Sequence, residues 1–451
     1  MKIVIAGAGD IGFHLAKLLS AEKQDIILID TNQDVLDYAQ SHLDVMTIRG
    51  DSASLEVLRR AEISKAKLFL GVTTSEKNNI FSAILAKKMG ADQTIARVNN
   101  PEFLAEDEKA NFVELGIDSL ISPLQLAAKE IYRLIKQERV TDIFDFEDGK
   151  ISLVGLTLDD RSYFINRAIK EVFPFASNGK REDNVCKPIA ILRGNQTFLP
   201  HEQTLLRQND HLYFITKKNQ IDDVINMAGK EKRRIRNIMI IGGGEMTFRT
   251  AQLLEDEYNV TIVEKDKEAC KDLIEKLHHS LVIQGDYSNF ELLKEEGLNT
   301  MDVFISLTEN TETNILSSLV AKNCGVGKTI AQVENIEYTH ISQNIGIDTL
   351  INKKLIAANN IFRYVRKGHV EAITSLHGVD AEVIEFLVTK NNRLTKKPLR
   401  DLHLPESAMV GGVIRGEESM LVDEEFQLQI GDKVIIFTLP EAIGKVEKLF
   451  H

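Results

Sequence analysis

The residues best suited to chemistry stand at the start of the chain. Residues 7–12 read Gly-Ala-Gly-Asp-Ile-Gly, a G-x-G-x-x-G sequence that follows a β-branched run and opens a helical pattern. Gly7 permits a tight turn, Gly9 lets a pyrophosphate approach the backbone, and Gly12 lets the helix pack closely on the strand. N–H groups at the start of that helix point at the phosphates. The helix opens with Asp10 and Ile11.

A carboxylate follows at the distance that a dinucleotide fold requires. Asp30 ends the second β-branched run, about 20 residues after the turn, where a carboxylate accepts hydrogen bonds from both ribose hydroxyls. The next residues are Thr31 and Asn32, with no nearby Lys or Arg to hold a 2′-phosphate. The pattern therefore predicts NAD(H) rather than NADP(H). The alternative is a fold of this kind whose site is empty.

Further polar residues follow neighbouring strand-like runs. Asp51 follows the third run, Thr73 and Thr74 end the fourth, and Arg97 lies on the fifth. In an open parallel sheet, ligands bind at the carboxyl ends of the strands, so all four are candidates for the same site. Asp51 and the threonines are equally explained as residues that cap the next helix. Arg97 suits a phosphate, or an ion pair with a carboxylate.

The elements that must position these residues alternate regularly. Helical patterns at Ser54–Ala61 and Lys77–Met89 separate the strand-like runs. This alternation predicts βαβ units and a doubly wound parallel sheet with helices on both faces. A further amphipathic helix, from Leu124 to Ile135, packs on its own sheet or crosses to a neighbouring subunit. The expected strands are Lys2–Ala6, Asp25–Asp30, Val45–Ile48, Leu68–Val72, Thr94–Val98 and Ser119–Ile121.

The chain repeats itself, which divides it into four lobes. A shift of 235 positions superposes the first glycine turn on a second one, and a shift of 222 superposes the segments that follow. The fold class is therefore α/β, a tandem repeat of a Rossmann-like doubly wound parallel sheet followed by a small α+β lobe. We name the lobes N-lobe 1 (1–140), C-lobe 1 (141–229), N-lobe 2 (230–370) and C-lobe 2 (371–451). In the C-lobes, Arg193 and Asp210 correspond to Arg415 and Asp432.

N-lobe 2 departs from the pattern of N-lobe 1. Gly242 and Gly244 keep the first two glycines, but the third is replaced by Thr247, whose side chain is expected to push the helix off the strand. Glu264 replaces Asp30 and still suits a ribose, and Asp286 corresponds to Asp51. This lobe is expected to bind another nucleotide, or nothing.

Composition excludes several classes of protein. The chain has 451 residues, with 55 Lys and Arg against 67 Asp and Glu, a formal net charge of −12. An acidic chain of this kind is not expected to bind nucleic acid. The three cysteines are scattered, and no apolar run approaches the ~18 residues of a membrane span. The sequence therefore predicts a protein of the cytoplasm. The basic run at 230–236 is expected to be a solvated linker, or else a contact for anionic lipid or an acidic partner.

The sequence offers no catalytic constellation. Hydride transfer needs a general acid or base beside the cofactor, but the C-lobe histidines do not correspond between the repeats, and neither a metal motif nor a nucleophile elbow occurs. We therefore expect no enzyme, no catalytic residue and no metal.

The glycine turn, Asp30, Gly50-Asp51, the run from Thr73 to Asn79 and Ile95-Ala96-Arg97 resemble the RCK (KTN) domains that regulate potassium conductance. The tandem arrangement is similar to the cytosolic regulatory subunits of Trk-type potassium transporters. The resemblance implies a homo-tetrameric ring at the inner face of the membrane that binds NAD(H), and ATP or ADP, and gates a Trk-type potassium channel subunit. It also implies which residues line each site. These are Gly7, Gly9, Gly12, Asp30, Asp51, Thr73 and Arg97 in the first, and Gly242, Gly244, Glu264 and Asp286 in the second. The alternatives are an NAD-dependent oxidoreductase with a degenerate second half and an RCK sensor of another cation transporter.

Overall fold

The computed structural model describes residues 1–21, 24–136, 142–158, 162–173, 186–194, 196–229, 235–334, 346–366, 372–375, 381–389 and 393–450. They form two compact units. One contains both parallel sheets (residues 1–132, 237–336 and 350–365), and the other contains both antiparallel sheets (133–236, 337–349 and 366–451). The four predicted lobes thus each have a sheet of their own, while their boundaries stay predictions. Most of the basic run at 230–236 lies outside the described residues.

N-lobe 1 is the predicted doubly wound sheet. Its strand order is β3-β2-β1-β4-β5-β6, and every adjacent pair is parallel. The order reverses between β2-β1 and β4, which places a crevice at the carboxyl ends of β1 and β4. The strands are β1 (Lys2–Ala6), β2 (Asp25–Asp30), β3 (Met46–Arg49), β4 (Leu68–Gly71), β5 (Gln93–Arg97) and β6 (Ser119–Ile121). The α-helices are α1 (Asp10–Ala21), α2 (Gln33–His42), α3 (Leu55–Arg60), α4 (Glu76–Lys88), α5 (Glu106–Leu115) and α6 (Pro123–Lys136).

N-lobe 2 repeats this topology in the order β14-β13-β12-β15-β16-β17. Glu264 pairs with Gln284 in the sheet as Asp30 pairs with Arg49, so Glu264 occupies the place of Asp30. The offset across this strand is 234, one less than elsewhere in the repeat. The strands are β12 (Asn237–Ile241), β13 (Asn259–Glu264), β14 (Leu281–Gln284), β15 (Val303–Ser306), β16 (Lys328–Gln332) and β17 (Thr349–Ile351). The helices are α9 (Glu245–Leu254), α10 (Lys267–Lys276), α11 (Phe290–Glu295), α12 (Thr311–Asn323) and α14 (Lys353–Arg366).

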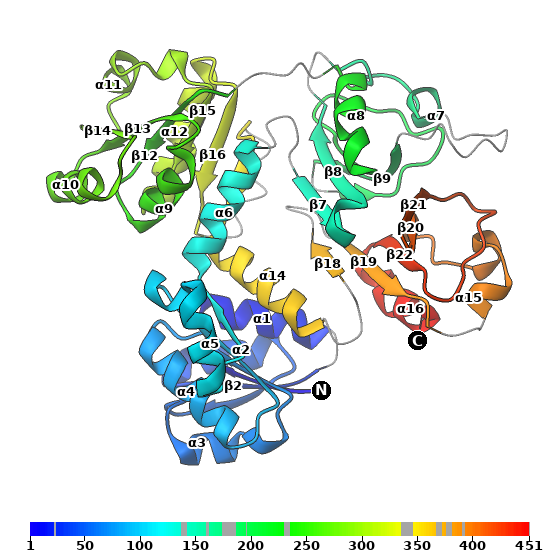
Figure 1. Ribbon diagram of the computed structural model, residues 1–451, viewed down its shortest axis with the longest axis horizontal. Helices are drawn as coiled ribbons and strands as arrows, with labels where there is room; N and C mark the ends of the chain where they lie inside the picture. The colour runs from blue at the N-terminus through cyan, green and yellow to red at the C-terminus, as the bar shows by residue number, and fades with distance from the viewer. Residues whose placement is uncertain are drawn as a thin grey trace. The chain divides into compact units, whose positions relative to one another are not determined.

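Helix α14 of N-lobe 2 packs on N-lobe 1. Its buried residues Ala357, Ala358, Ile361 and Phe362 share one hydrophobic cluster with β1 and α1 of the first lobe. Figure 1 shows this helix lying against the blue first lobe beside α1. The sequence left two options for a terminal helix, its own sheet or a neighbouring subunit. For α14 the structure gives a third, the other half of the same chain, and this links the two N-lobes through a common core.

The C-lobes are antiparallel sheets with the orders β10-β9-β11-β8-β7 and β18-β19-β22-β20-β21. Arg193 holds the buried Asp210 through two hydrogen bonds of 2.8 Å, and Arg415 holds Asp432 through two of 2.7 Å. The repeat of these residues in the sequence thus reflects a repeated ion pair. In C-lobe 1 the elements are β7 (Asp142–Phe146), β8 (Ile151–Thr157), α7 (Ile169–Val172), β9 (Cys186–Arg193), β10 (Gln196–Phe198), β11 (His211–Thr216) and α8 (Ile221–Met227). In C-lobe 2 they are β18 (Ala372–Ser375), β19 (Glu382–Leu387), α15 (Arg393–Lys396), β20 (Ala408–Arg415), β21 (Glu418–Leu421), β22 (Lys433–Thr438) and α16 (Pro440–Phe450).

Candidate functional site

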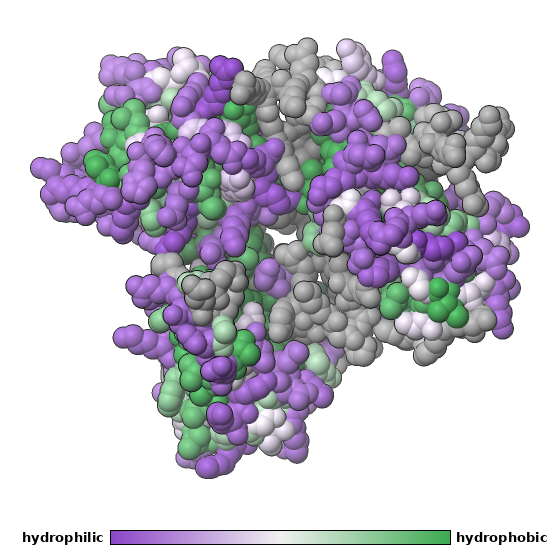
Figure 2. Space-filling model, in the orientation of Figure 1, coloured by the Kyte–Doolittle hydropathy of each residue, from purple (hydrophilic) through white to green (hydrophobic). Residues whose placement is uncertain are grey.

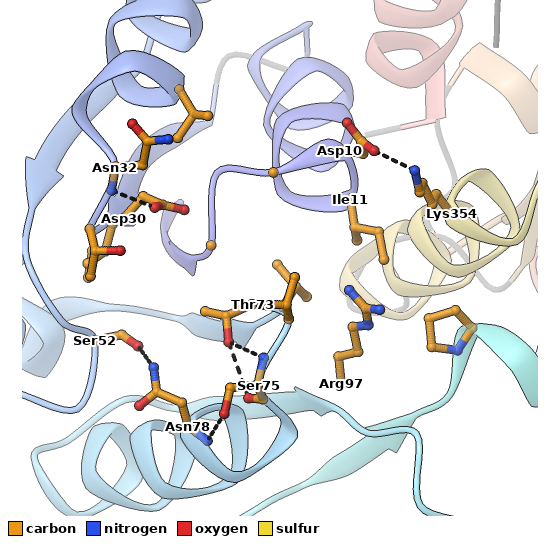
Figure 3. A pocket seen from close by; sticks show the side chains of 18 of the residues that line it. Asp10, Ile11, Asp30, Asn32, Ser52, Thr73, Ser75, Asn78, Arg97 and Lys354 are labelled. Carbon is orange, nitrogen blue, oxygen red and sulfur yellow. Dashed lines mark hydrogen bonds and ion pairs between the residues drawn. The ribbon is translucent and has the colours of Figure 1, made fainter. Parts of the chain in front are cut away.

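A cavity of about 670 Å³ lies at the carboxyl edge of the N-lobe 1 sheet. Its walls come from the glycine turn, the residues that follow β2, β3 and β4, the end of β5, and the start of α14 (Figure 3). The residues predicted for the first site are brought together here. The lining includes Gly7, Gly9, Asp10, Ile11, Asp30, Asp51, Thr73, Thr74 and Arg97. Gly12 is not among the lining residues, in keeping with its predicted role in helix packing.

The glycine turn is shaped by close backbone contacts. Gly7 has a φ of +103°, a conformation that favours glycine. A Cβ atom on Gly12 would lie 1.8 Å from the carbonyl oxygen of Gly7, so only glycine fits there. A Cβ atom on Gly9 would meet nothing within 4 Å, because this residue faces the open cavity. The turn thus combines a tightly packed base with an open surface for a ligand.

Asp30 lies where its carboxylate closes the turn from the side. It accepts hydrogen bonds from the backbone N–H groups of Ala8, at 2.8 Å, and of Asn32, at 2.9 Å. Each carboxylate oxygen keeps a second lone pair, which a ribose hydroxyl can use. The carboxylate is therefore held in a fixed orientation before a ligand arrives.

Asp51 both stabilises the local backbone and lines the cavity. The carboxylate accepts a hydrogen bond of 2.9 Å from the N–H of Ala53, and it lines the cavity. Asn78 donates to Ser52 at 3.2 Å, which ties the start of α4 to the loop after β3. The loop is thus fixed by internal hydrogen bonds, of which Figure 3 shows the one between Asn78 and Ser52, while the carboxylate of Asp51 lines the cavity.

Three cationic side chains line the cavity. Arg97 comes from β5, and Lys353 and Lys354 come from α14. Burial lowers the pKa of Arg97, and in the part of the chain that the structure describes its guanidinium has no carboxylate within ion-pair distance. The two lysines were not predicted from the sequence, because they lie in the other half of the chain. The repeat gave no signal for them, since only the packing of α14 brings them here.

The corresponding site in N-lobe 2 differs at the third glycine position and at its acidic residue. Gly242 keeps the positive φ, at +108°, and α9 still begins at the matching residue even though Thr247 is fully buried. Among the described residues, the hydroxyl of Thr247 has no hydrogen-bond partner. Glu264 is buried against Gly243, since a Cβ atom on that glycine would lie 2.5 Å from its Cγ. The acid that would meet a ribose is thus buried, although it accepts a hydrogen bond from the N–H of Asp266 as Asp30 does from that of Asn32.

Other predicted residues of N-lobe 2 serve the local backbone. Asp286 accepts hydrogen bonds from the N–H and the hydroxyl of Ser288, at 2.9 and 2.7 Å, and these lower its pKa. Gln332, in the place of Arg97, has lost the positive charge and donates to Glu334 at 3.3 Å. The second site therefore differs from the first in shape and in charge.

The described residues contain neither a membrane-spanning helix nor a cluster of metal ligands. No helix there is long and apolar enough to cross a membrane. No group of three or more His, Cys, Asp or Glu side chains could hold a metal ion there.

Known proteins are similar to this chain over its whole length. The family model of the TrkA-N domain matches residues 3–123 and 238–353, and the model of the TrkA-C domain matches residues 383–451. The chain is 32% identical to the Trk system potassium uptake protein TrkA homolog of Archaeoglobus fulgidus, over 100% of both chains. It is 31% identical to the Trk system potassium uptake protein TrkA of Haemophilus influenzae, over 100% of this chain and 99% of that one.

Solved structures share the fold. The GsuK RCK domain superposes with a TM-score of 0.61 at 15% identity, over 100% of this chain and 94% of that chain. The GsuK channel bound to NAD gives the same score and identity, over 100% of this chain and 78% of that one. At this identity the likeness establishes the fold, which is that of tandem RCK domains.

Proposed function

Because the chain belongs to the TrkA family of Trk system potassium uptake proteins, we propose that it regulates a Trk-type membrane transporter according to the nucleotide bound in N-lobe 1. The observation that carries this proposal is the cavity at the glycine turn. It joins a fixed acidic group, an open turn and three cations at the switch point of a Rossmann-like sheet. This is the place where such sheets bind nucleotides.

The proposed ligand of this site is NAD(H), with ATP or ADP as the alternative occupant. Asp30 receives the ribose hydroxyls, and the pyrophosphate lies over the turn at Gly9. The GsuK channel, a protein of the same fold, has been solved bound to NAD and also bound to ADP. N-lobe 2 is proposed to be empty or to hold a different ligand, because Glu264 is buried there.

The proposed role is regulatory and not enzymatic. A hydride-transferring enzyme needs a proton donor or acceptor close to the nicotinamide. The titratable groups that line the cavity are the carboxylates Asp10, Asp30 and Asp51 and the cations Arg97, Lys353 and Lys354. No His, Cys or Tyr is among the residues that line it. We therefore propose that the ligand acts as a signal.

The proposed working form is a homo-tetramer on the cytoplasmic side of the membrane, attached through its transporter. Phe81 on α4 and Leu316 on α12 occupy equivalent positions in the repeat, and they are 52% and 59% exposed. Figure 2 shows hydrophobic residues at the surface over N-lobe 1 on an otherwise largely hydrophilic face. Exposed apolar residues at matching places are typical of surfaces that pair between copies.

The proposed mechanism is a shift of population. A nucleotide that binds one arrangement of the lobes more tightly than another favours that arrangement. A coupling of about 1–3 kcal/mol is enough for regulation of this kind. Helix α14 is one element through which N-lobe 1 contacts the second half, because its residues belong to the hydrophobic core of N-lobe 1.

The test is potassium uptake in cells of the source organism that lack this chain. Uptake of rubidium, as a tracer for potassium, should fall and should be restored by the wild-type chain but not by Asp30→Ala. Unchanged uptake in the deletion strain would overturn the proposed function. Restoration by Asp30→Ala as strong as by the wild type would remove the nucleotide from the mechanism.

A further inference from the structure

We propose that the second half of the chain completes the nucleotide site of N-lobe 1. Lys353 and Lys354 take the terminal phosphates of a nucleoside triphosphate, and Glu334 is a built-in competitor that holds these lysines until the phosphates arrive. This inference rests on the proposed function and adds the residues that distinguish a polyphosphate ligand from NADH.

Helix α14 brings its first turn to the nucleotide cavity. Its core residues are buried against N-lobe 1, which brings its first turn to the cavity wall. Asn352 fixes that turn, since its side-chain oxygen accepts from the N–H groups of Lys354 and Leu355, at 3.0 and 3.1 Å. The lysines are thus presented by a packed and capped helix.

The two repeats differ in the residues at the start of α6 and α14. Val98 and Val333 donate to Ile121 and Ile351, at 2.9 Å each, so α6 and α14 begin at equivalent positions. The residues of α6 that match the two lysines are Pro123 and Leu124, and both also line the cavity. Asn99, in turn, stands where the second half has Glu334. The second half therefore adds two cations and one carboxylate that the first half lacks.

Glu334 forms ion pairs with both lysines. Its carboxylate lies 2.8 Å from the ammonium groups of both Lys353 and Lys354. Lys354 also lies 2.5 Å from the carboxylate of Asp10 (Figure 3). Partial burial disfavours the charge on Glu334, but hydrogen bonds from the two lysines outweigh this and lower its pKa. Two carboxylates thus hold the two lysines in place.

Arg97 faces the part of the cavity where Lys354 lies (Figure 3). Among the described residues it has no carboxylate partner, although it is partly buried. A guanidinium in such a place is suited to a phosphate oxygen, which it binds through paired hydrogen bonds. Arg97 and the two lysines together can neutralise the charge of a terminal phosphate.

The chemistry of the two ligands differs at this end. With the adenosine ribose at Asp30 and the first phosphates at the turn, NADH places an uncharged ribose and nicotinamide toward Arg97. ATP places a further phosphate there. Binding of that phosphate releases Glu334, which lies two residues after the end of β16, and so changes contacts within the second half. The lysines therefore carry the signal from ligand to N-lobe 2.

The experiment is calorimetric titration of the purified full-length chain with ATP and, separately, with NADH. The double variant Lys353→Gln/Lys354→Gln should bind ATP at least tenfold more weakly and NADH within about twofold of wild type. Glu334→Gln should bind ATP more tightly, because the competing carboxylate is gone. Lys271→Gln, which removes a charge paired with Glu268 on α10, should leave both affinities unchanged.

Three outcomes separate the possibilities. Equal ATP affinity in wild type and in the double variant would overturn this inference while leaving the proposed function intact. Loss of NADH and ATP binding together, with an unchanged melting temperature, would also overturn it, since the lysines would then not discriminate. If the double variant does not fold, the single change Glu334→Gln decides, and weaker or unchanged ATP binding there contradicts the competitor role.

Discussion

Asn79 accepts hydrogen bonds from both the backbone N–H and the hydroxyl of Thr73, at 2.8 and 2.6 Å. Its amide group also donates to the carbonyl oxygens of Thr73 and Arg97, at 3.0 and 2.9 Å. Asn79 is fully buried, and one side chain thus joins the loop after β4 to the end of β5. Asn314 makes the same four hydrogen bonds around Thr308 in N-lobe 2.

Replacing Asn79 should lower both the stability of the chain and its affinity for a nucleotide, whereas replacing Asn314 should lower stability alone. Asn79→Ala leaves buried N–H and C=O groups unpaired, and we expect a loss of about 3 kcal/mol, since each costs about 1–3 kcal/mol. Nucleotide affinity should fall as well, because the wall formed by Thr73 and Arg97 is released. Asn314→Ala should cost similar stability without changing affinity in N-lobe 1. Thermal unfolding and calorimetric titration check both, and an unaffected affinity in Asn79→Ala would contradict the positioning role.

The glycines of the turn make opposite predictions. Gly12→Ala should unfold N-lobe 1 locally, because its Cβ would lie 1.8 Å from a backbone oxygen. Gly9→Ala should keep the melting temperature within about 2 °C of wild type, since nothing lies within 4 Å of its Cβ. The added methyl group should nevertheless weaken nucleotide binding, because the pyrophosphate must approach this backbone closely.

Gly244→Ala is the matched control for Gly9→Ala. Its Cβ also meets nothing within 4 Å. If N-lobe 1 holds the nucleotide, this variant binds like the wild type. A stronger effect of Gly244→Ala than of Gly9→Ala would assign the ligand to N-lobe 2 instead.

The ion pairs of the C-lobes should be important for stability. Asp210 is 1% exposed, and Asp210→Asn leaves Arg193 without its charged partner. Removal of one partner of a buried pair costs about 3–5 kcal/mol, and we expect the lower end here because the arginine is partly exposed. Scanning calorimetry should show the C-lobe transition at lower temperature, with nucleotide binding unchanged. The double variant Arg193→Met/Asp210→Leu should recover part of the loss. No recovery would mean that the hydrogen bonds from Arg193 to the Leu205 carbonyl and from the Arg207 N–H to Asp210 contribute more than the ion pair itself.

His14 gives the chain a defined dependence on pH. Burial, together with nearby Lys17, lowers the pKa of His14 to about 4 from its usual 6.5. Between these values the unfolded chain takes up a proton that the folded chain does not, so stability is lost as the pH falls from about 6.5 toward 4. The loss from this residue is about 3 kcal/mol, at about 1.4 kcal/mol for each pKa unit. His14→Gln should lose less stability than wild type between pH 7 and pH 5 in urea unfolding, and an identical loss would contradict the assignment.

The fold could be predicted from the sequence because the residues that repeat are ones that determine the backbone conformation or the packing of an element. The turns at Gly7 and Gly242, the alternation of strands and helices, and the paired Arg193 and Asp210 each have a local physical cause. Strand ends differ from the prediction by a single residue, as at β3, which begins at Met46. Such ends depend on hydrogen bonds to the neighbouring strand, which the single sequence does not reveal.

The candidate site could be predicted only in part. Residues that follow strands of one sheet must meet at its carboxyl edge, which is why Asp30, Asp51 and Thr73 line one cavity, while their role in binding a nucleotide stays a prediction. Lys353 and Lys354 were missed because they reach the cavity through the crossing of α14, which depends on tertiary packing. Asn79 has a counterpart, Asn314, at the repeat offset of 235, but its role in joining the loop after β4 to the end of β5 follows only from the structure.

The central claim, a nucleotide site in N-lobe 1, is tested most directly by calorimetric titration of the full chain with NADH. Wild type and Glu264→Ala should bind with the same affinity. Asp30→Ala should bind at least tenfold more weakly, because a hydrogen bond to a charged group contributes about 1.5–3 kcal/mol and tenfold corresponds to about 1.4 kcal/mol. Equal NADH binding by Asp30→Ala and wild type, or loss of binding only in Glu264→Ala, would contradict the claim.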